Sequence, residues 1–361
     1  MAVSHPDPVG SLARDRAVVV CAGPGGVGKT TISAAIALQA ARDGRRSCVI
    51  TVDPARRLAD ALGVGALTNT PATVEGDFAG TLHALMLDTK GTFDELVDRH
   101  ARTEAQGEAI RANRIYQNLT GMLSGTQEYM AMEKLYELTE SGDFDIVVVD
   151  TPPTRNALDL LDAPRRLTRF LDNRLFRALL APTRASLRVL TIATQALLKT
   201  ISRVAGAEIV QDAVDFFQAF EGMEEGFSSR AAAVRDLLAE PSTAYVLVTS
   251  PRPDSISETA YFAARLGDTG VEPAALIVNR VHPEFGTVQA DSRHGGDLGV
   301  LLENHARLSR IATEEAKAVS ALVEQVAPSP VARLRLLDSD VHDLEGLGAV
   351  ADLLFGPQPV G

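Results

Sequence analysis

Residues 22–31 read "AGPGGVGKTT" and are the strongest indication of the fold class of this chain. The stretch satisfies the pattern G-x-x-x-x-G-K-[ST] with Gly23, Gly28, Lys29 and Thr30. The apolar run "AVVVCAG" leads into it and the helix-compatible run "KTTISAAIALQAARD" leads out, so the loop joins a strand to a helix. The amides of such a loop point at phosphate oxygens beside the positive end of the helix. The stretch therefore predicts a phosphate-binding loop in an α/β fold.

The residues of this loop have distinct predicted roles. We expect nucleotide contacts from Gly25, Gly26, Val27, Gly28, Lys29, Thr30 and Thr31. Lys29 would bridge the β- and γ-phosphates of a nucleotide, and the Thr30 hydroxyl would bind Mg²⁺. The alternative is a glycine-rich turn that binds nothing.

Further strand-like runs set the architecture. They are "SCVITVD" (47–53), "LHALMLD" (82–88), "DIVVVDTPP" (145–153), "AYVLVTS" (244–250) and "AALIVNR" (274–280). Near-continuous Val, Ile and Leu is typical of parallel strands buried on both faces, and helical segments separate most of the runs. The sequence predicts an α/β fold of the P-loop nucleoside triphosphatase class, with a mostly parallel, doubly wound sheet. Gly44 is expected to close the first helix.

Two stretches, at about 91–140 and 155–238, lack strand runs and carry apolar residues at spacings of three and four. This periodicity predicts helical insertions. We expect one ATPase domain over 16–355, between a flexible tail at 1–15 and a short tail at 356–361. The polar, glycine-containing piece "TVQADSRHGGDLG" near 287–299 is interpreted as an exposed loop.

Composition limits the function classes. The net charge of −12 over 361 residues repels phosphodiester backbones, so we expect no nucleic-acid partner. The two cysteines, Cys21 and Cys48, lie in apolar runs, which favours reduced core residues in a cytoplasmic protein. We find neither a secretory signal nor an uncharged apolar run of about 18 residues, so no intrinsic membrane span is expected.

Two carboxylates follow strand runs directly, at Asp53 and Asp150. Open α/β sheets bind ligands at the carboxyl ends of their strands. We expect Asp150 to hold Mg²⁺ through water, and Asp53 to orient or deprotonate the water that attacks the γ-phosphate. Either residue taken alone has the alternative of a helix cap or a turn residue.

A set of ordered motifs extends the comparison to nearly the whole chain, roughly residues 17–350. They are "GPGGVGKTT", "DPARRLADALG", "GMLSGTQEYMAMEKLYEL", "FDIVVVDTPPTRNALDLLDAP", "LIVNR" and "RLRLLDSDVHDLEGL". Together they resemble the arsenical-pump, ArsA-type anion-transporting ATPase family, which includes ATPases that target tail-anchored membrane proteins. The resemblance implies a first switch at Asp53–Asp60, a second at Asp150 to about Leu158, an adenine contact at Asn279 and a nucleotide-bridged dimer.

The loop departs from the family pattern at one position. The family usually reads G-K-G-G-V-G-K-T-T, in which the first lysine reaches the phosphates of the partner subunit, whereas this chain has Pro24 there. Proline supplies neither charge nor an amide proton. Arg56 and Arg57 in the first switch, or Arg155 in the second, could stabilise transition-state charge instead. The alternative is that all three arginines are solvated surface charges.

The resemblance leads to a functional hypothesis with one alternative. The hypothesis is Mg²⁺-dependent ATP hydrolysis that controls a homodimer or heterodimer, which binds, targets or transfers a client or regulates a membrane transport partner. The alternative is a weakly active, nucleotide-sensing subunit that pairs with a paralogue carrying the signature lysine.

The client and metal sites are the least specified features. The family's arsenite and zinc sites use cysteines that this sequence lacks, and His294 is interpreted as a loop residue. A hydrophobic client groove could be lined by Phe216, Phe217, Phe220, Met223, Phe227, Met122, Met130 and Met132. We favour core packing for these side chains, because the apolar stripe of a helix normally faces the protein interior.

Overall fold

The computed structural model describes residues 9–53, 57–117, 126–152, 207–283, 286 and 296–356. The chain divides into two compact units. The first takes in residues 1–87, 137–158 and 239–361, and the second takes in 88–136 and 159–238.

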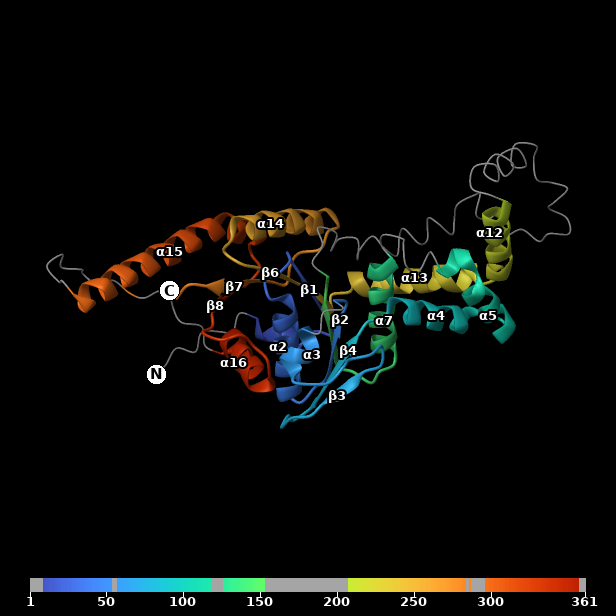
Figure 1. Cartoon of the computed structure of the whole chain (residues 1–361), viewed down its shortest axis with the longest axis horizontal. Coiled ribbons are helices and arrows are strands. Elements are labelled where there is room, and N and C mark those ends of the chain that lie inside the picture. Colours follow the sequence, from blue (N-terminus) through green and yellow to red (C-terminus); the bar gives the residue numbers. More distant parts are fainter. Residues whose placement is uncertain are drawn as a thin grey trace. The chain divides into compact units, whose positions relative to one another are not determined.

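The first unit is built on an eight-stranded sheet (Figure 1). Its strands are β1 (Val18–Ala22), β2 (Arg46–Thr51), β3 (Ala72–Val74), β4 (Thr81–Met86), β5 (Ile146–Asp150), β6 (Thr243–Thr249), β7 (Ala275–Val281) and β8 (Val331–Arg335). They lie in the order β3-β4-β2-β5-β1-β6-β7-β8, and each pairing is parallel except that of β3 with β4. The six strands predicted from apolar runs are confirmed.

The central strands are mostly apolar because helices cover both faces of the sheet. Every residue of β1, β5 and β6 is buried. The two strands that the sequence did not predict are the edge strands. β8 alternates buried and exposed side chains, and β3 has three residues of which only Val74 is buried.

Helices pack on both sides of this sheet. Those of the first unit are α1 (Gly10–Arg14), α2 (Lys29–Arg42), α3 (Arg57–Leu62), α14 (Pro253–Asp268), α15 (Asp297–Val326) and α16 (Leu344–Phe355). Figure 1 shows α2, α3 and α16 on one side, with α14 and α15 on the other, as expected for a doubly wound fold. The predicted end of the first helix is close to the observed one: Asp43 is the C-cap, and Gly44 follows with φ of 89°.

The second unit is helical over its described residues. It contains α4 (Thr89–His100), α5 (Glu104–Ala112) and α12 (Ala207–Phe220), most of α7 (Thr126–Glu140) and most of α13 (Glu224–Ala239). The side chains of Asp88 and Thr103 cap α4 and α5 by accepting hydrogen bonds from backbone amides of the first turn.

The phenylalanine and methionine stripe belongs to the core of this unit. Buried members of the stripe are Phe216, Phe220, Met223, Phe227, Met130 and Met132. The rings of Phe220 and Phe227 lie 4.9 Å apart, centroid to centroid. The core interpretation is therefore confirmed for these six residues, while Met122 and the side chain of Phe217 lie outside the described residues.

Several sequence expectations fall outside the described residues. These are Arg56 and Arg155, the second switch beyond Pro152, His294, most of the 287–299 loop, and most of the two tails. The extents of the insertions, 91–140 and 155–238, and the single ATPase domain over 16–355 stay predictions.

Candidate functional site

The glycine-rich loop runs from the end of β1 to the start of α2, as predicted, and positive φ together with close neighbours explains two of its glycines. Gly23 has φ of 156°, and a Cβ there would overlap the carbonyl oxygen of Val248 in β6. Gly28 has φ of 94°, and a Cβ there would overlap the side-chain nitrogen of Asn279. Any other residue at either position would be strained and would push the loop away from the sheet.

Lys29 is folded back beneath the loop. Its side chain is buried, and Nζ donates a 2.9 Å hydrogen bond to the carbonyl oxygen of Pro24. Burial lowers the pKa of Lys29, an effect that the nearby carboxylate of Asp150 opposes. The buried ammonium group is therefore held against the phosphate-binding loop by a neutral carbonyl, which is a weaker partner than a phosphate oxygen.

Asp150 lies at the end of β5 with its two carboxylate oxygens in different environments. Oδ2 accepts hydrogen bonds from the hydroxyls of Thr30, at 2.7 Å, and Thr51, at 2.9 Å. Oδ1 is buried and has no hydrogen-bond partner among the described residues. Burial raises the pKa of Asp150, while the two threonine hydroxyls oppose that rise.

Asp53 follows β2, the strand next to β5 in the sheet. Its backbone amide donates to Thr51 Oγ1 at 3.2 Å, so Thr51 connects the two aspartates. The Asp53 carboxylate is one-fifth exposed, and Oδ2 lies 3.7 Å from the Arg57 guanidinium. The structure thus brings Thr30, Asp53 and Asp150 together at the carboxyl edge of β1, β2 and β5, where ligands of open α/β sheets bind.

Asn279 lies at the end of β7 and holds the loop from the other side. Its side-chain nitrogen donates to the carbonyl oxygen of Val27 at 2.8 Å. Its neighbour Arg280, which the sequence reasoning did not single out, has φ of 63° and donates from Nη1 to the carbonyl oxygen of Gly26 at 2.8 Å. The two side chains approach consecutive residues of the loop from one strand end.

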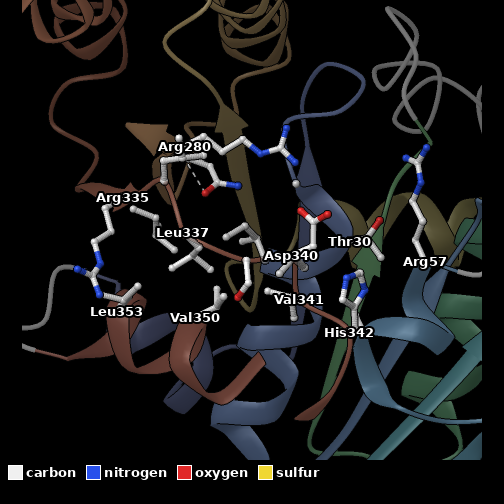
Figure 2. A pocket seen from close by; sticks show the side chains of 18 of the residues that line it. Thr30, Arg57, Arg280, Arg335, Leu337, Asp340, Val341, His342, Val350 and Leu353 are labelled. Carbon is white, nitrogen blue, oxygen red and sulfur yellow. Dashed lines mark hydrogen bonds between the residues drawn. The ribbon is translucent and has the colours of Figure 1, made fainter. Parts of the chain in front are cut away.

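A cavity of about 460 Å³ opens beside the loop (Figure 2). Five of the predicted nucleotide contacts line it, Gly26, Gly28, Thr30, Thr31 and Asn279, together with Arg280. Val27 and Lys29 are buried beneath the loop, and Gly25 is exposed on it. Arg57 also lines the cavity, so it is the one predicted substitute for the missing lysine that can be placed.

The far wall of the cavity comes from a segment to which the sequence assigned no role. Residues 334–337 and 339–342, from the last two residues of β8 into the connection to α16, lie there with Val350 and Leu353 of α16 (Figure 2). This segment lies within the string "RLRLLDSDVHDLEGL". Its leucines and aspartates follow no helical or strand periodicity, so the sequence did not indicate that it lines the site. Only the position of β8 at the sheet edge brings this segment to the cavity.

The cysteines, possible metal ligands and long apolar helices can be checked over the part of the chain that is described. Cys21 and Cys48 are buried, as predicted, and neither forms a disulfide among the described residues; burial raises the pKa of the Cys21 thiol to about 12. Among the described residues no group of three or more His, Cys, Asp and Glu is arranged to hold a metal ion by itself. In the same residues, no helix combines the length and apolar character needed to cross a bilayer.

A loop with φ-positive glycines, a buried lysine and two strand-end aspartates on a parallel sheet defines the class of P-loop nucleotide-binding proteins. A sequence profile described as anion-transporting ATPase matches residues 16–356. The chain belongs to this ATPase family.

Individual relatives cover the chain to different extents. An uncharacterized protein of Streptomyces coelicolor is 32% identical over 277 residues, which are 76% of this chain and 65% of that protein. ATPase GET3 of Malassezia globosa is 27% identical over 267 residues, covering 73% of this chain and 72% of its own. A putative arsenical pump-driving ATPase 1 of Aquifex aeolicus is 23% identical over 353 residues, or 95% of this chain and 79% of its own.

Proposed function

We propose that this chain binds Mg²⁺-ATP at the loop of residues 25–31 and hydrolyses it to ADP and phosphate. The observation that carries the proposal is the difference in hydrogen bonding between the two carboxylate oxygens of Asp150. Oδ2 is held by Thr30 and Thr51, whereas Oδ1 is buried without a hydrogen-bond partner among the described residues. A buried carboxylate oxygen left in this way costs free energy unless a further ligand satisfies it.

The donor set fits Mg²⁺, which prefers oxygen ligands and keeps several waters. Thr30 would hold the ion directly and Asp150 through a water. Because Thr30 donates its proton to Asp150, the lone pairs of its oxygen are free to face the ion. When bound, Mg²⁺ would neutralise charge on the β- and γ-phosphates.

The remaining roles follow from the positions of the side chains. Backbone amides of the loop would cradle the phosphates, and Lys29 would exchange the Pro24 carbonyl for a phosphate oxygen. Asp53 would orient the attacking water and accept its proton, with Arg57 beside it to balance the charge. The adenosine moiety would enter the cavity beside Thr31 and Asn279, against the wall formed by residues 334–342.

Mutation of Asp150 tests the magnesium arrangement. We expect Asp150→Asn to need about 10- to 100-fold more Mg²⁺ for half-maximal phosphate release, since outer-shell partners of a metal contribute on that scale. Asp145→Asn, at the opposite end of β5 where Asp145 pairs with Arg46, should keep the wild-type Mg²⁺ dependence. Equal Mg²⁺ dependence in all three proteins would remove Asp150 from the site.

The proposal also covers the process that ATP hydrolysis would control. We propose a nucleotide-controlled dimer, formed with itself or with a related ATPase, that binds, targets or transfers a client or regulates a membrane transport partner in the cytosol. Support comes from the family match, from relatives named ATPase GET3 and arsenical pump-driving ATPase, and from two buried cysteines that form no disulfide among the described residues. The mass of the native complex, purified with Mg²⁺ and a non-hydrolysable ATP analogue, would give stoichiometry and partner. A monomer under those conditions would contradict the dimer.

A further inference from the structure

We propose that Arg280 is a phosphate-binding residue of the nucleotide site and supplies from this chain's own sheet a positive charge that Pro24 cannot. The inference rests on the proposed ATP site and adds a residue to it. Three arginines line the cavity: Arg57, Arg280 and Arg335. Of these, Arg280 has a guanidinium that touches the phosphate-binding loop, through the 2.8 Å bond from Nη1 to the Gly26 carbonyl.

The backbone of Arg280 is the first reason to assign it a function. It is the one described non-glycine residue with positive φ, at 63°. An arginine in this conformation is strained, and such strain persists where the surrounding structure holds it in place and is concentrated at ligand sites. Arginine has no intrinsic preference for a positive φ. We therefore infer that the role of the Arg280 side chain outweighs the energetic cost of its backbone conformation.

The surroundings do hold this conformation in place. The pairing of β7 with β8 shifts register between Val278 and Val281, which turns residue 280 out of the regular strand. The Arg280 amide donates to Asn279 Oδ1 at 2.9 Å. Beyond it, Glu315 of α15 accepts from the His282 amide and contacts His282 Nδ1, both at 2.8 Å. These contacts fix the strand end and direct Arg280 toward the loop.

The present partner of the guanidinium is a poor match for its charge. The Gly26 carbonyl is neutral and accepts from one of five N–H donors, and the side chain is otherwise exposed. A phosphate offers charged oxygens that pair with the guanidinium fork more strongly. The geometry therefore suits a cation that rests on the loop when phosphate is absent and transfers to phosphate when a nucleotide enters.

Two substitutions separate this role from a structural one. Arg280→Gly removes the side chain and suits φ of 63°, so the protein should melt at or above the wild-type temperature. Arg280→Lys keeps the charge and should keep part of the affinity. Arg333→Gln is the matched control, because Arg333 is an exposed arginine of neighbouring β8 that does not line the cavity.

The experiment is calorimetric titration with Mg²⁺ and a non-hydrolysable ATP analogue, ADP or AMP. For Arg280→Gly we expect about a 10- to 100-fold loss of affinity for the ATP analogue, the range of a hydrogen bond to a charged group. The loss should be smaller for ADP and absent for AMP, while Arg333→Gln binds all three as wild type does.

Other outcomes would overturn the assignment. Equal losses for all three nucleotides would place Arg280 at the base or ribose, and a fall in melting temperature with unchanged affinities would make it a brace for the loop. Failure of the wild-type chain to bind the ATP analogue would instead contradict the proposed function. Wild-type binding with no effect of Arg280→Gly would contradict this inference alone.

Discussion

The buried ammonium group of Lys29 donates a hydrogen bond to the carbonyl oxygen of Pro24, five residues earlier in the phosphate-binding loop. The loop thus uses the carbonyl group of residue 24, which proline retains, and not the N–H, which proline lacks. Pro24 also has a fixed φ, so it reduces the freedom of the unfolded chain at this point. The residue that looked like a defect in the sequence is compatible with a complete loop.

Substitution of Pro24 measures what the proline contributes. We expect Pro24→Ala to keep the Lys29 contact and to change ATP turnover by less than about threefold, while lowering the free energy of unfolding by about 0.4–1 kcal/mol. Pro24→Lys should also leave the turnover of the isolated chain within about threefold of Pro24→Ala, because Arg280 already provides positive charge beside the loop. A tenfold or larger gain in Pro24→Lys would mean that the missing lysine limits hydrolysis, and would favour a partner chain that donates one.

Thr51 joins the two predicted aspartates, so its hydroxyl should affect Mg²⁺ use. Thr51→Val keeps the shape of the side chain but removes one hydrogen bond to Asp150 Oδ2 and the acceptor for the Asp53 amide. We expect the Mg²⁺ concentration for half-maximal activity to rise by about tenfold or more, as a hydrogen bond to a charged group contributes about 1.5–3 kcal/mol. Ser47→Ala removes a hydroxyl at the opposite end of β2 and serves as the control. Equal Mg²⁺ dependence in the two variants would speak against the role of Thr51.

A buried ion pair stabilises the helical unit. Arg230 Nε donates to Glu133 Oε1 at 2.6 Å, and the guanidinium lies 4.1 Å from the centroid of the Tyr136 ring. Removing one partner of a buried pair leaves an uncompensated charge and costs about 3–5 kcal/mol, which we expect for Arg230→Ala in urea unfolding followed by circular dichroism. Arg235→Ala breaks an exposed pair with Asp236 and should cost at most about 1 kcal/mol. If the two variants lost similar free energies of unfolding, burial would not increase the cost of removing one member of an ion pair.

His100 should make the second unit sensitive to acid. Burial, together with Arg230 and Arg99, lowers the pKa of His100, and its Nε2 has no hydrogen-bond partner among the described residues. The unfolded chain takes up a proton on this side chain as the pH falls below about 6.5, while the folded unit resists it, so stability is lost on acidification. We expect His100→Gln to lose less melting temperature than wild type between pH 7.5 and pH 5, with His305→Gln on α15 as the control. If the melting temperature of His100→Gln fell as much as that of wild type, other groups would be responsible for the acid sensitivity.

The sequence predicted those parts of the molecule that local patterns determine. Continuous apolar runs identified six strands because most residues of those strands are buried, and the spacing of glycines and Lys29 identified the loop. Strand β8 was missed because an edge strand alternates buried with exposed side chains over only five residues. Arg280 was missed for a different reason: its partner Gly26 is 254 positions away in the chain, and its backbone conformation depends on a register shift that no local pattern records.

Asp53 is proposed to enable hydrolysis of the nucleotide that the loop binds, so the decisive variant is Asp53→Asn. The amide keeps the size of the side chain but is a poor base, so single-turnover hydrolysis should fall by about 10²- to 10⁴-fold. Affinity for Mg²⁺-ATP should stay within about threefold of wild type, because Thr30, Lys29 and Asp150 are intact. Asp77→Asn, an exposed aspartate of the same unit, should behave as wild type in both assays. Hydrolysis by Asp53→Asn within a fewfold of the wild-type rate would show that Asp53 does not enable hydrolysis.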